Sequence, residues 1–435
     1  MTYRPPDRAT TSRPFNPMLV VGALIGAAVI VAVVIFALSQ RDDGSVGDAS
    51  GGPTASLPAS DAPAPSASTS PSASAQPEPS EAAGPPTIAW EEPAAFDGEP
   101  EELMVDGETW VAVGWSAERG PGAWTSPDAR EWERAEVVDP QPDDTFRGAG
   151  LGPTVRLGDS LLSFGTFIGC CDGRGIHAWR SADGRSWEVI ESDSPLFETG
   201  YVVTELVVGD PALVAVEGRY AGFTGRFWRW TEETSWVETT PGTAGTEDPS
   251  GIQTEDVAWA DGRFVVVGTR GDPMAPGPVT GTSWTSADGQ SWEESSPGGE
   301  LESIALLQVA PMPGGGFAAL GASEAGGSGN DGVPVAFTSP DGLSWTPVKA
   351  PPAEPNVRPT EIIMVDGGLV ALGSDMTTTT FVWTSADGNS WTDAGRLDFV
   401  PMAAAALGDQ LVVITADYDP AEPDGGYLIH RGSLD

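Results

Sequence analysis

Ser286-Ala-Asp-Gly-Gln-Ser-Trp292 is one of five copies of a seven-residue pattern that decides the fold of this chain. The other copies are Ser126-Pro-Asp-Ala-Arg-Glu-Trp132, Ser181-Ala-Asp-Gly-Arg-Ser-Trp187, Ser339-Pro-Asp-Gly-Leu-Ser-Trp345 and Ser385-Ala-Asp-Gly-Asn-Ser-Trp391. Each copy has Ser first, Asp third and Trp seventh. Gly follows the Asp in every copy except the one at 126–132, which has Ala. A recurrence of roughly 50 residues is typical of one supersecondary unit stacked several times, so the pattern predicts a repeat architecture.

Short β-rich runs surround each copy. Two runs precede each copy. Before the copy at 286–292 they are 257–259 and 264–267, and the Asp-Gly turn Asp261-Gly262 joins them. A third run, such as 282–285, leads into the pattern and a fourth leaves it. Each repeat is therefore predicted to be a four-stranded antiparallel meander.

The repeats also predict how the array closes. Residues 202–239 keep the rhythm although their pattern has decayed, whereas the C-terminal stretch 399–431 supplies only three runs. Ile88-Ala-Trp90-Glu-Glu-Pro stands alone before the first full repeat and is similar to the run that leaves a pattern. We predict that it completes the last sheet and closes a ring of seven blades without an open sheet edge at the seam.

The five patterns resemble the Asp box, or BNR repeat, of sialidases and related β-propellers. The resemblance covers residues 87–435 and implies an all-β, seven-bladed β-propeller of four-stranded antiparallel blades. In such turns the Ser and Asp oxygens accept backbone N–H groups, Gly takes a positive φ and Trp packs against neighbouring strands. The residues predicted to have these structural roles are Ser126, Asp128, Trp132, Ser181, Asp183, Trp187, Ser286, Asp288, Trp292, Ser339, Asp341, Trp345, Ser385, Asp387 and Trp391.

The resemblance also implies a chemistry: an arginine triad that grips a carboxylate, a Tyr nucleophile assisted by Glu, and an acidic general acid. No basic residue occurs between Arg41 and Arg119, where the family places its first arginine. We therefore assign no catalytic residue and expect no cofactor. A glycoside hydrolase of the exo-sialidase-like group is kept as the alternative.

Connections of two kinds place the expected ligand face. In a meander, the turns within strand pairs one–two and three–four share one face, and here they are short. The other connections share the opposite face and are long: 116–122, 139–147, 167–175, 240–251, 270–281, 323–334, 350–359 and 417–425. Binding residues usually lie on such loops, so the candidate ligand-face residues are Arg147, Arg219, Tyr220 and Arg270.

The N-terminal residues predict an anchor. Residues 18–38 form an uninterrupted apolar run that is long enough to cross a membrane as a helix. Arginines precede this run and two aspartates follow it, so residues 1–17 are expected in the cytoplasm and the propeller outside the cell. A cleaved signal peptide is the alternative. Residues 42–86 are rich in Ala, Ser and Pro and are predicted to be a disordered linker.

The charge of the chain limits the classes of binding partner, and its few cysteines limit the possible disulfides. The net charge of −42 argues against binding to nucleic acid or anionic lipid. Cys170 and Cys171 are adjacent and are the only cysteines, so they form a vicinal disulfide or stay as two thiols. A segment with four carboxylates could hold Ca²⁺ loosely, although a solvated acidic loop is favoured; its acids are Asp417, Asp419, Glu422 and Asp424.

Together these features predict a single-pass, membrane-anchored, extracytoplasmic β-propeller. The leading hypothesis for its function is that it acts as an interaction module that binds a glycan or a protein at the cell surface. The alternatives are the glycoside hydrolase named above and an assembly or scaffold factor.

Overall fold

The computed structural model describes residues 84–116, 120–140, 149–167, 176–190, 196, 202–210, 212–218, 225–241, 252–270, 279–296, 299–323, 332–352, 355–375, 377–417 and 426–435. All of them belong to one compact unit, Glu78–Asp435. The predicted segments 1–17 and 18–38 and the linker up to residue 83 lie outside these ranges. Among the described residues, no helix is long and apolar enough to span a membrane.

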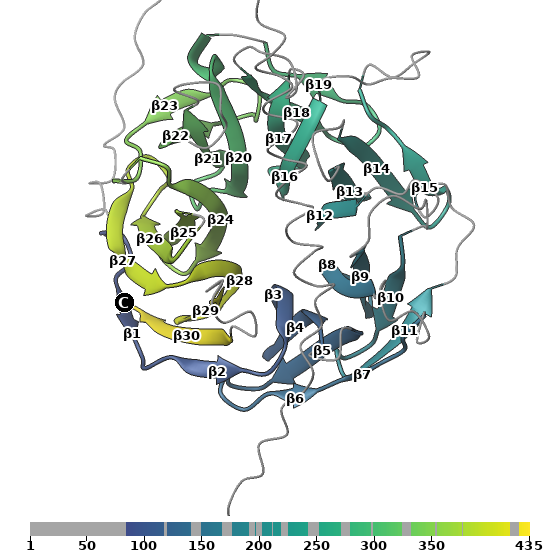
Figure 1. Ribbon diagram of the computed structural model, residues 1–435. Helices are drawn as coiled ribbons and strands as arrows, with labels where there is room; N and C mark the ends of the chain where they lie inside the picture. Colours follow the sequence, from purple (N-terminus) through teal and green to yellow (C-terminus); the bar gives the residue numbers. More distant parts are fainter. Residues whose placement is uncertain are drawn as a thin grey trace, which may run out of the picture. The chain divides into compact units, whose positions relative to one another are not determined.

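Seven sheets, called blades 1 to 7, surround a common centre (Figure 1). Blades 1 to 3 contain β3 (Glu99–Asp106), β4 (Thr109–Trp115), β5 (Pro121–Ser126) and β6 (Glu133–Arg134); β8 (Ala149–Leu157), β9 (Ser160–Phe167), β10 (Ala178–Ser181) and β11 (Ser186–Ile190); and β12 (Val202–Val208), β13 (Leu213–Gly218), β14 (Arg226–Thr231) and β15 (Ser235–Glu238). Blades 4 and 5 contain β16 (Ile252–Ala260), β17 (Arg263–Arg270), β18 (Thr280–Ser286) and β19 (Glu293–Glu294); and, after the 3₁₀ turn η2 (Gly299–Leu301), β20 (Ile304–Pro311), β21 (Phe317–Ser323), β22 (Val333–Ser339) and β23 (Thr346–Val348). Blades 6 and 7 contain β24 (Arg358–Val365), β25 (Gly368–Ser374), β26 (Thr379–Ser385) and β27 (Thr392–Asp398); and β28 (Val400–Leu407), β29 (Gln410–Ala416), β30 (Tyr427–Leu434) and β1 (Ile88–Trp90).

The prediction of an all-β propeller with seven four-stranded antiparallel blades is confirmed, with two additions. In blade 2 the short strand β7 (Glu136–Val137) pairs in parallel with β11, on the chain's way from blade 1. In blade 7 the strand β2 (Ala94–Phe96) pairs with β30 before the chain enters blade 1. β7 covers the outermost strand of blade 2, and β2 pairs with Tyr427–Ile429 of β30, beyond the part that β1 covers. Both additions protect an edge that would otherwise present unpaired backbone groups.

The predicted seam is confirmed. β1 pairs with β30 in antiparallel register, with Ile88 opposite Leu434 and Trp90 opposite Gly432. Beyond the strand, the N–H of Asp435 donates to the carbonyl of Thr87 at 3.0 Å. The N-terminal strand of the unit therefore supplies the outermost strand of the last blade, and the ring closes by pairing residues from the two ends of the unit.

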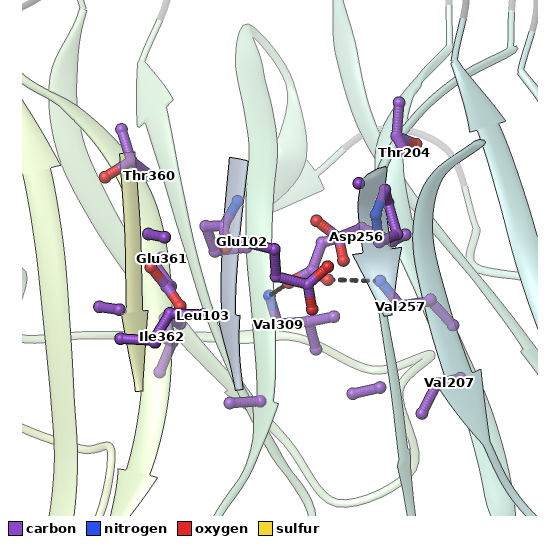
Figure 2. Close-up of a pocket in the computed structure, with 18 of the residues that line it drawn as sticks. Glu102, Leu103, Thr204, Val207, Asp256, Val257, Val309, Thr360, Glu361 and Ile362 are labelled. Atoms are coloured by element: carbon purple, nitrogen blue, oxygen red, sulfur yellow. Dashed lines mark hydrogen bonds between the residues drawn. The ribbon is translucent and has the colours of Figure 1, made fainter. Parts of the chain in front are cut away.

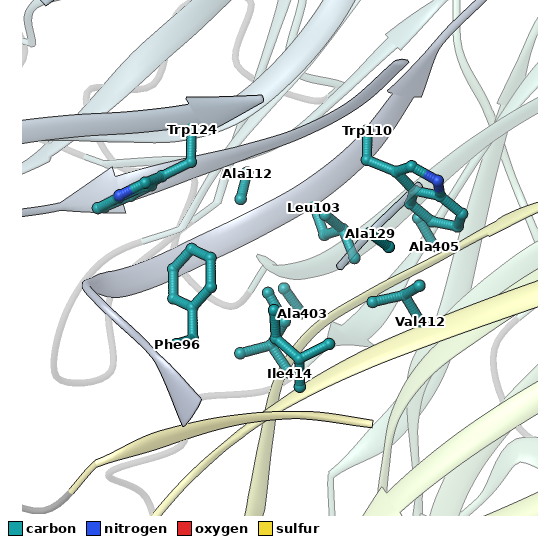
Figure 3. Packing of buried hydrophobic residues seen from close by; sticks show 11 residues of the cluster. Phe96, Leu103, Trp110, Ala112, Trp124, Ala129, Ala403, Ala405, Val412 and Ile414 are labelled. Carbon is teal, nitrogen blue, oxygen red and sulfur yellow. The ribbon is translucent and has the colours of Figure 1, made fainter. Parts of the chain in front are cut away.

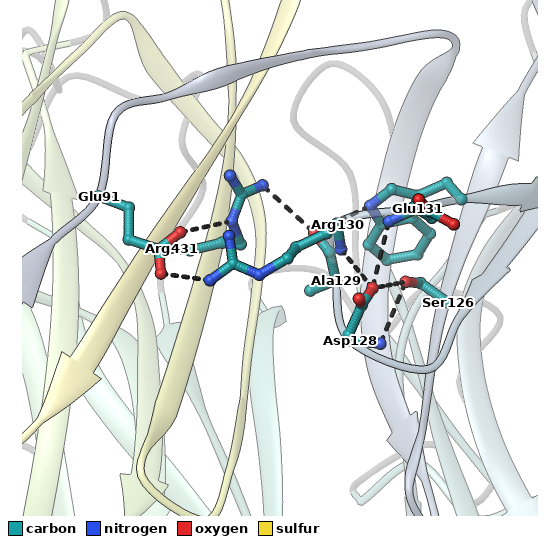
Figure 4. Close-up of polar contacts among 8 residues, drawn as sticks. Glu91, Ser126, Asp128, Ala129, Arg130, Glu131 and Arg431 are labelled. Carbon is teal, nitrogen blue, oxygen red and sulfur yellow. Dashed lines mark hydrogen bonds and ion pairs between the residues drawn. The ribbon is translucent and has the colours of Figure 1, made fainter.

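An ion-pair cluster extends the seam to blade 1 (Figure 4). The Glu91 carboxylate accepts a hydrogen bond from Arg431 Nε at 3.1 Å and pairs with the Arg130 guanidinium. Arg431 also donates to the carbonyl of Ala129 at 3.3 Å. These groups are partly or largely solvent-exposed, so their net contribution to stability is small, but they link blade 7 to blade 1.

The repeated turns make the contacts that their residue types allow. In blade 4, Ser286 Oγ accepts the N–H of Gly289 at 2.8 Å, and Asp288 Oδ1 accepts the N–H groups of Gln290 and Ser291, both at 2.9 Å. The equivalent Asp accepts turn N–H groups in the other four copies as well. Hydrogen bonding to the backbone of Ser291 in particular lowers the pKa of Asp288, which keeps this carboxylate ionised in its structural role.

The residue after the Asp packs against the preceding blade. Gly289, Gly342 and their equivalents have φ near 70–80°, and Ala129 in blade 1 has φ 56°. A Cβ on Gly342 would lie 2.5 Å from Val265 Cγ2 in blade 4. At Gly342, glycine is therefore favoured for two reasons, its positive φ and its close contact with the preceding blade.

Replacing Gly342 with Ala is expected to lower the free energy of unfolding by roughly 2–4 kcal/mol, because the left-handed backbone costs about 1–2 kcal/mol and overpacking adds about 1–3 kcal/mol. Gly262→Ala is the matched control. Its φ of +71° is close to the +73° of Gly342, but a Cβ added to Gly262 would have no atom within 4 Å. Chemical denaturation should show the smaller loss for Gly262→Ala; equal losses would mean that the contact between blades is unimportant.

Apolar cores lie between neighbouring blades. At the closure, Leu103, Trp110 and Ala112 of blade 1 pack with Val412 and Ile414 of blade 7, and all five are nearly or fully buried (Figure 3). Ala129 of the first repeated turn joins the same cluster. Each blade thus buries its apolar surface mainly against its neighbours, as expected for a stacked repeat.

Candidate functional site

The seven innermost strands share one irregularity. β3, β8, β12, β16, β20, β24 and β28 each contain a β-bulge, seen as a register shift against the second strand of the blade. A bulge bends the strand and changes the direction in which a side chain points. The bulges lie near the middle of the strands, so they form a ring about halfway along the centre of the propeller.

Acidic side chains follow four of these bulges. Glu102 on β3, Glu205 on β12, Asp256 on β16 and Glu361 on β24 each occupy the position just after the unpaired residue, and Gln308 occupies it on β20. All four acidic residues are half-buried. Four carboxyl groups and one amide are therefore brought together from five blades that are distant in sequence.

These side chains line a central cavity of about 560 Å³ (Figure 2). Residues from all seven innermost strands contribute to its wall, and Figure 2 shows Glu102, Asp256 and Glu361 projecting into the same space from three strands. Apolar residues such as Val207 and Trp259 also line the cavity. The described lining residues include no Lys, Arg or His. The volume is in the range of small-molecule binding sites.

Three of the four acids also join neighbouring blades. Asp256 accepts the N–H of Val309 in blade 5 at 2.8 Å, in addition to that of its own neighbour Val257 at 2.6 Å. Glu361 accepts a backbone hydrogen bond from Ala404 in blade 7. Glu102 does the same with Thr154 in blade 2. Each contact therefore runs from one innermost strand to the innermost strand of the following blade.

The cavity raises the pKa of its carboxyl groups. Burial raises the pKa of Glu361 to about 8 and that of Asp256 to about 7, and like-charge repulsion from Asp256 adds to the effect at Glu361. Burial also raises the pKa of Glu102 and Glu205 well above the ordinary range. Desolvation disfavours the charged form of an acid, and charges facing one another across a small cavity reinforce this. Near neutral pH these groups can therefore both donate and accept hydrogen bonds.

The arrangement has clear chemical capacities. Carboxyl groups with pKa values near neutrality suit hydroxyl-rich ligands, which offer paired donors and acceptors, and their anionic forms suit positively charged groups. In the part of the chain that the structure describes, no three His, Cys, Asp or Glu side chains are placed so that they could hold one metal ion.

The residues predicted for the ligand face have different outcomes. Arg270 ends β17 on the face of the long connections, and its guanidinium donates to both carboxylate oxygens of Glu294 in the same blade. Arg147, Arg219 and Tyr220 lie outside the described residues. Cys170 and Cys171 also lie outside the described residues. Of the four acids considered for a loose Ca²⁺ site, Asp417 is described, whereas Asp419, Glu422 and Asp424 are not.

Sequence reasoning missed the ring of acids in the cavity. A signal for it exists: Glu101-Glu102-Leu, Thr204-Glu205-Leu, Glu255-Asp256-Val and Thr360-Glu361-Ile place an acid at the same point of the first β-run in four repeats. An acid in the middle of an apolar strand is costly unless it faces water or a partner. Aligning the repeats with one another would have shown these acids on one level of the ring.

Comparisons with known proteins give only distant similarities. No family model matches the chain, and no curated protein does. Solved structures similar to it include the polysaccharide lyase Uly1 (9% identity, TM-score 0.49, covering 78% of this chain and 90% of that one) and the WD40 β-propeller domain of Doa1 (13%, 0.48, 80% and 97%). The α-L-arabinanase of Penicillium chrysogenum is another (13%, 0.41, 65% and 92%). At these values the similarity carries no argument about the fold or the activity of this chain.

Proposed function

We propose that the chain is a membrane-anchored, extracytoplasmic β-propeller that binds a glycan or a protein at the cell surface, and that the central cavity is its binding site. In this proposal residues 18–38 are the anchor, residues 42–86 are the linker and the repeated turns are Asp boxes with a structural role. The observation that carries the proposal is the cavity of about 560 Å³ with carboxyl groups from four blades.

The composition of the cavity selects among ligands. An anionic sugar such as a sialic acid needs cationic partners, whereas the described wall offers acids, one amide, two threonine hydroxyls and apolar groups. A neutral glycan can use these acids as hydrogen-bond partners, and the Trp259 side chain adds an aromatic wall. A lysine or arginine side chain of a protein partner would pair with the ionised acids. We therefore favour a neutral glycan or a basic protein segment as the ligand.

A binding screen tests the proposal. The purified chain, labelled outside the cavity, would be applied to an array of neutral, acidic and amino-bearing glycans and of basic peptides. We expect binding to neutral glycans or basic peptides and none to sialosides. Selective binding to acidic glycans would contradict the proposed cavity.

The glycoside hydrolase is a second candidate because the raised pKa values of Asp256 and Glu361 are also typical of general acids. Glycosidases commonly use two carboxyl groups, one as acid and the other as base or nucleophile. In this cavity, however, Asp256 and Glu361 accept backbone N–H groups of the next blade, which gives both a structural task.

A turnover assay separates the two functions. We expect the purified chain to release no fluorophore from a fluorogenic sialoside above the buffer blank, since gripping the sugar carboxylate needs several guanidinium groups. The same assay with neutral aryl glycosides covers other hydrolases. Saturable turnover that is lost in Glu361→Gln would establish the hydrolase and overturn the binding-module proposal.

A further inference from the structure

The acids of the central cavity form contacts that a change of charge would affect directly. Asp256, Glu361 and Glu102 each hold a backbone N–H group of the next blade, and they face one another and Glu205 across one cavity. When all four are ionised, their repulsion acts between blades 1, 3, 4 and 6. Since the same side chains both hold neighbouring strands and repel across the centre, the ring's charge and the contacts between blades are coupled.

The charged groups around the ring come from few strands. β3 adds Glu101 beside Glu102, and β16 adds Glu255 beside Asp256. Among the described residues, the cation that acts on this group is Arg358, at the start of β24, which opposes the effect of burial at Glu255. The described lining residues of β8, β20 and β28 are uncharged, including Gln308 and Met402. Negative charge in the ring is therefore compensated poorly from within the cavity wall.

We propose that this carboxyl ring is a pH-sensitive latch in the propeller: protonation in mildly acidic medium removes the repulsion between blades across the cavity, and ionisation above neutrality restores this repulsion and destabilises the closed ring. The latch is a property of the fold and holds whether or not the cavity binds the ligand proposed above.

The sign follows from proton linkage. In the unfolded chain these acids titrate near their ordinary values of 3.8 and 4.5, whereas in the folded chain Asp256 and Glu361 titrate near 7 and 8. Between about pH 4.5 and 8 the folded chain therefore binds protons that the unfolded chain has released. Stability is highest at the acidic end of this window and falls as the pH rises through it.

Thermal unfolding of the full-length chain at pH 5.5 and pH 8.5 tests the latch. We expect the wild-type Tm to be lower at pH 8.5 by about 5 °C or more, a shift of the size that a few interacting groups produce. The double variant Asp256→Asn, Glu361→Gln should lose at least half of this difference, because amide oxygens still accept the backbone N–H groups but do not titrate. The matched control is Glu188→Gln on the outer strand β11, where the side chain is exposed and the full difference should persist.

Two measurements exclude a general effect of the chain's net charge. At about 1 M NaCl the Debye length is about 3 Å, so repulsion between surface charges is screened but the cavity is affected much less, and the Tm difference should remain. Hydrogen exchange of wild type, corrected for the intrinsic pH dependence, should show at least tenfold lower protection at pH 8.5 of the amides that pair β16 with β17 and β24 with β25. This readout needs no variant, so it also serves if the double variant does not fold.

The proposal is overturned by any of three results: a Tm difference that is unchanged in the double variant, one that disappears in 1 M NaCl, or equal protection of the β16 and β24 amides at the two pH values. Loss of ligand binding without any of these results would leave the latch intact and bear only on the proposed function.

Discussion

A chain that begins at residue 93 is expected to lose roughly 3–5 kcal/mol of unfolding free energy relative to one that begins at residue 84. The deletion removes β1 and leaves Gly432–Leu434 of β30 as an open edge, while β2 still pairs with Tyr427–Ile429. It also removes Ile88 and Trp90, which pack against the cluster of Val413 and Leu434 in blade 7. Loss of a large, partly buried aromatic side chain together with strand pairing explains the size of the effect.

Urea denaturation of the two chains measures this difference. Glu91→Gln in the longer chain is the matched control, because it weakens the ion pairs with Arg130 and Arg431 but leaves β1 in place. Its cost should be below about 1 kcal/mol, as for other exposed ion pairs. Equal midpoints for the chains beginning at 84 and 93 would show that the ring does not depend on the seam.

The second large effect is on binding. Glu205→Gln is expected to weaken binding of a ligand from the screen by roughly 10- to 100-fold, because a hydrogen bond to a charged group contributes about 1.5–3 kcal/mol. Glu205 lies among Glu102, Asp256 and Glu361, so its charge acts at the centre of the ring. Calorimetric titration of the wild-type chain and the variant at the same pH measures the change most directly.

Arg270→Ala provides the comparison for that experiment. Its guanidinium is on the face of the long connections and is held by Glu294, so its loss should change the affinity by less than about threefold. If Arg270→Ala abolishes binding and Glu205→Gln does not, the ligand binds at the loops, as the sequence alone suggested.

The fold was predictable because its determinants are local and repeated. Each Ser-x-Asp turn forms its hydrogen bonds within a few residues, as Ser286 and Asp288 do, so its sequence reports its structure. The seam was predictable for a related reason: the run at Ile88–Trp90 has the composition of an outermost strand, and the last repeat lacks one. The strands β2 and β7 were not predictable. β2 has three residues and β7 has two, and such short stretches carry no strand pattern of their own.

The site was not predicted because its contacts are non-local. The side chain of Glu361 is near Asp256 only after the ring has closed, and its hydrogen bond goes to Ala404 in the next blade. Alternation along a strand tells which residues share a face, but it does not tell which face lines a cavity. The bulge before each acid also shifts the alternation by one residue, which hides the pattern from any simple period.

Binding of the ligand in the central cavity is tested most directly by hydrogen exchange of the full-length chain with and without saturating ligand. If the ligand binds there, it should slow exchange in the middle of β3, β12, β16 and β24, around Glu102, Glu205, Asp256 and Glu361, with little change in the outermost strands. Slower exchange confined to the long connections, with the four innermost strands unchanged, would contradict binding in the cavity.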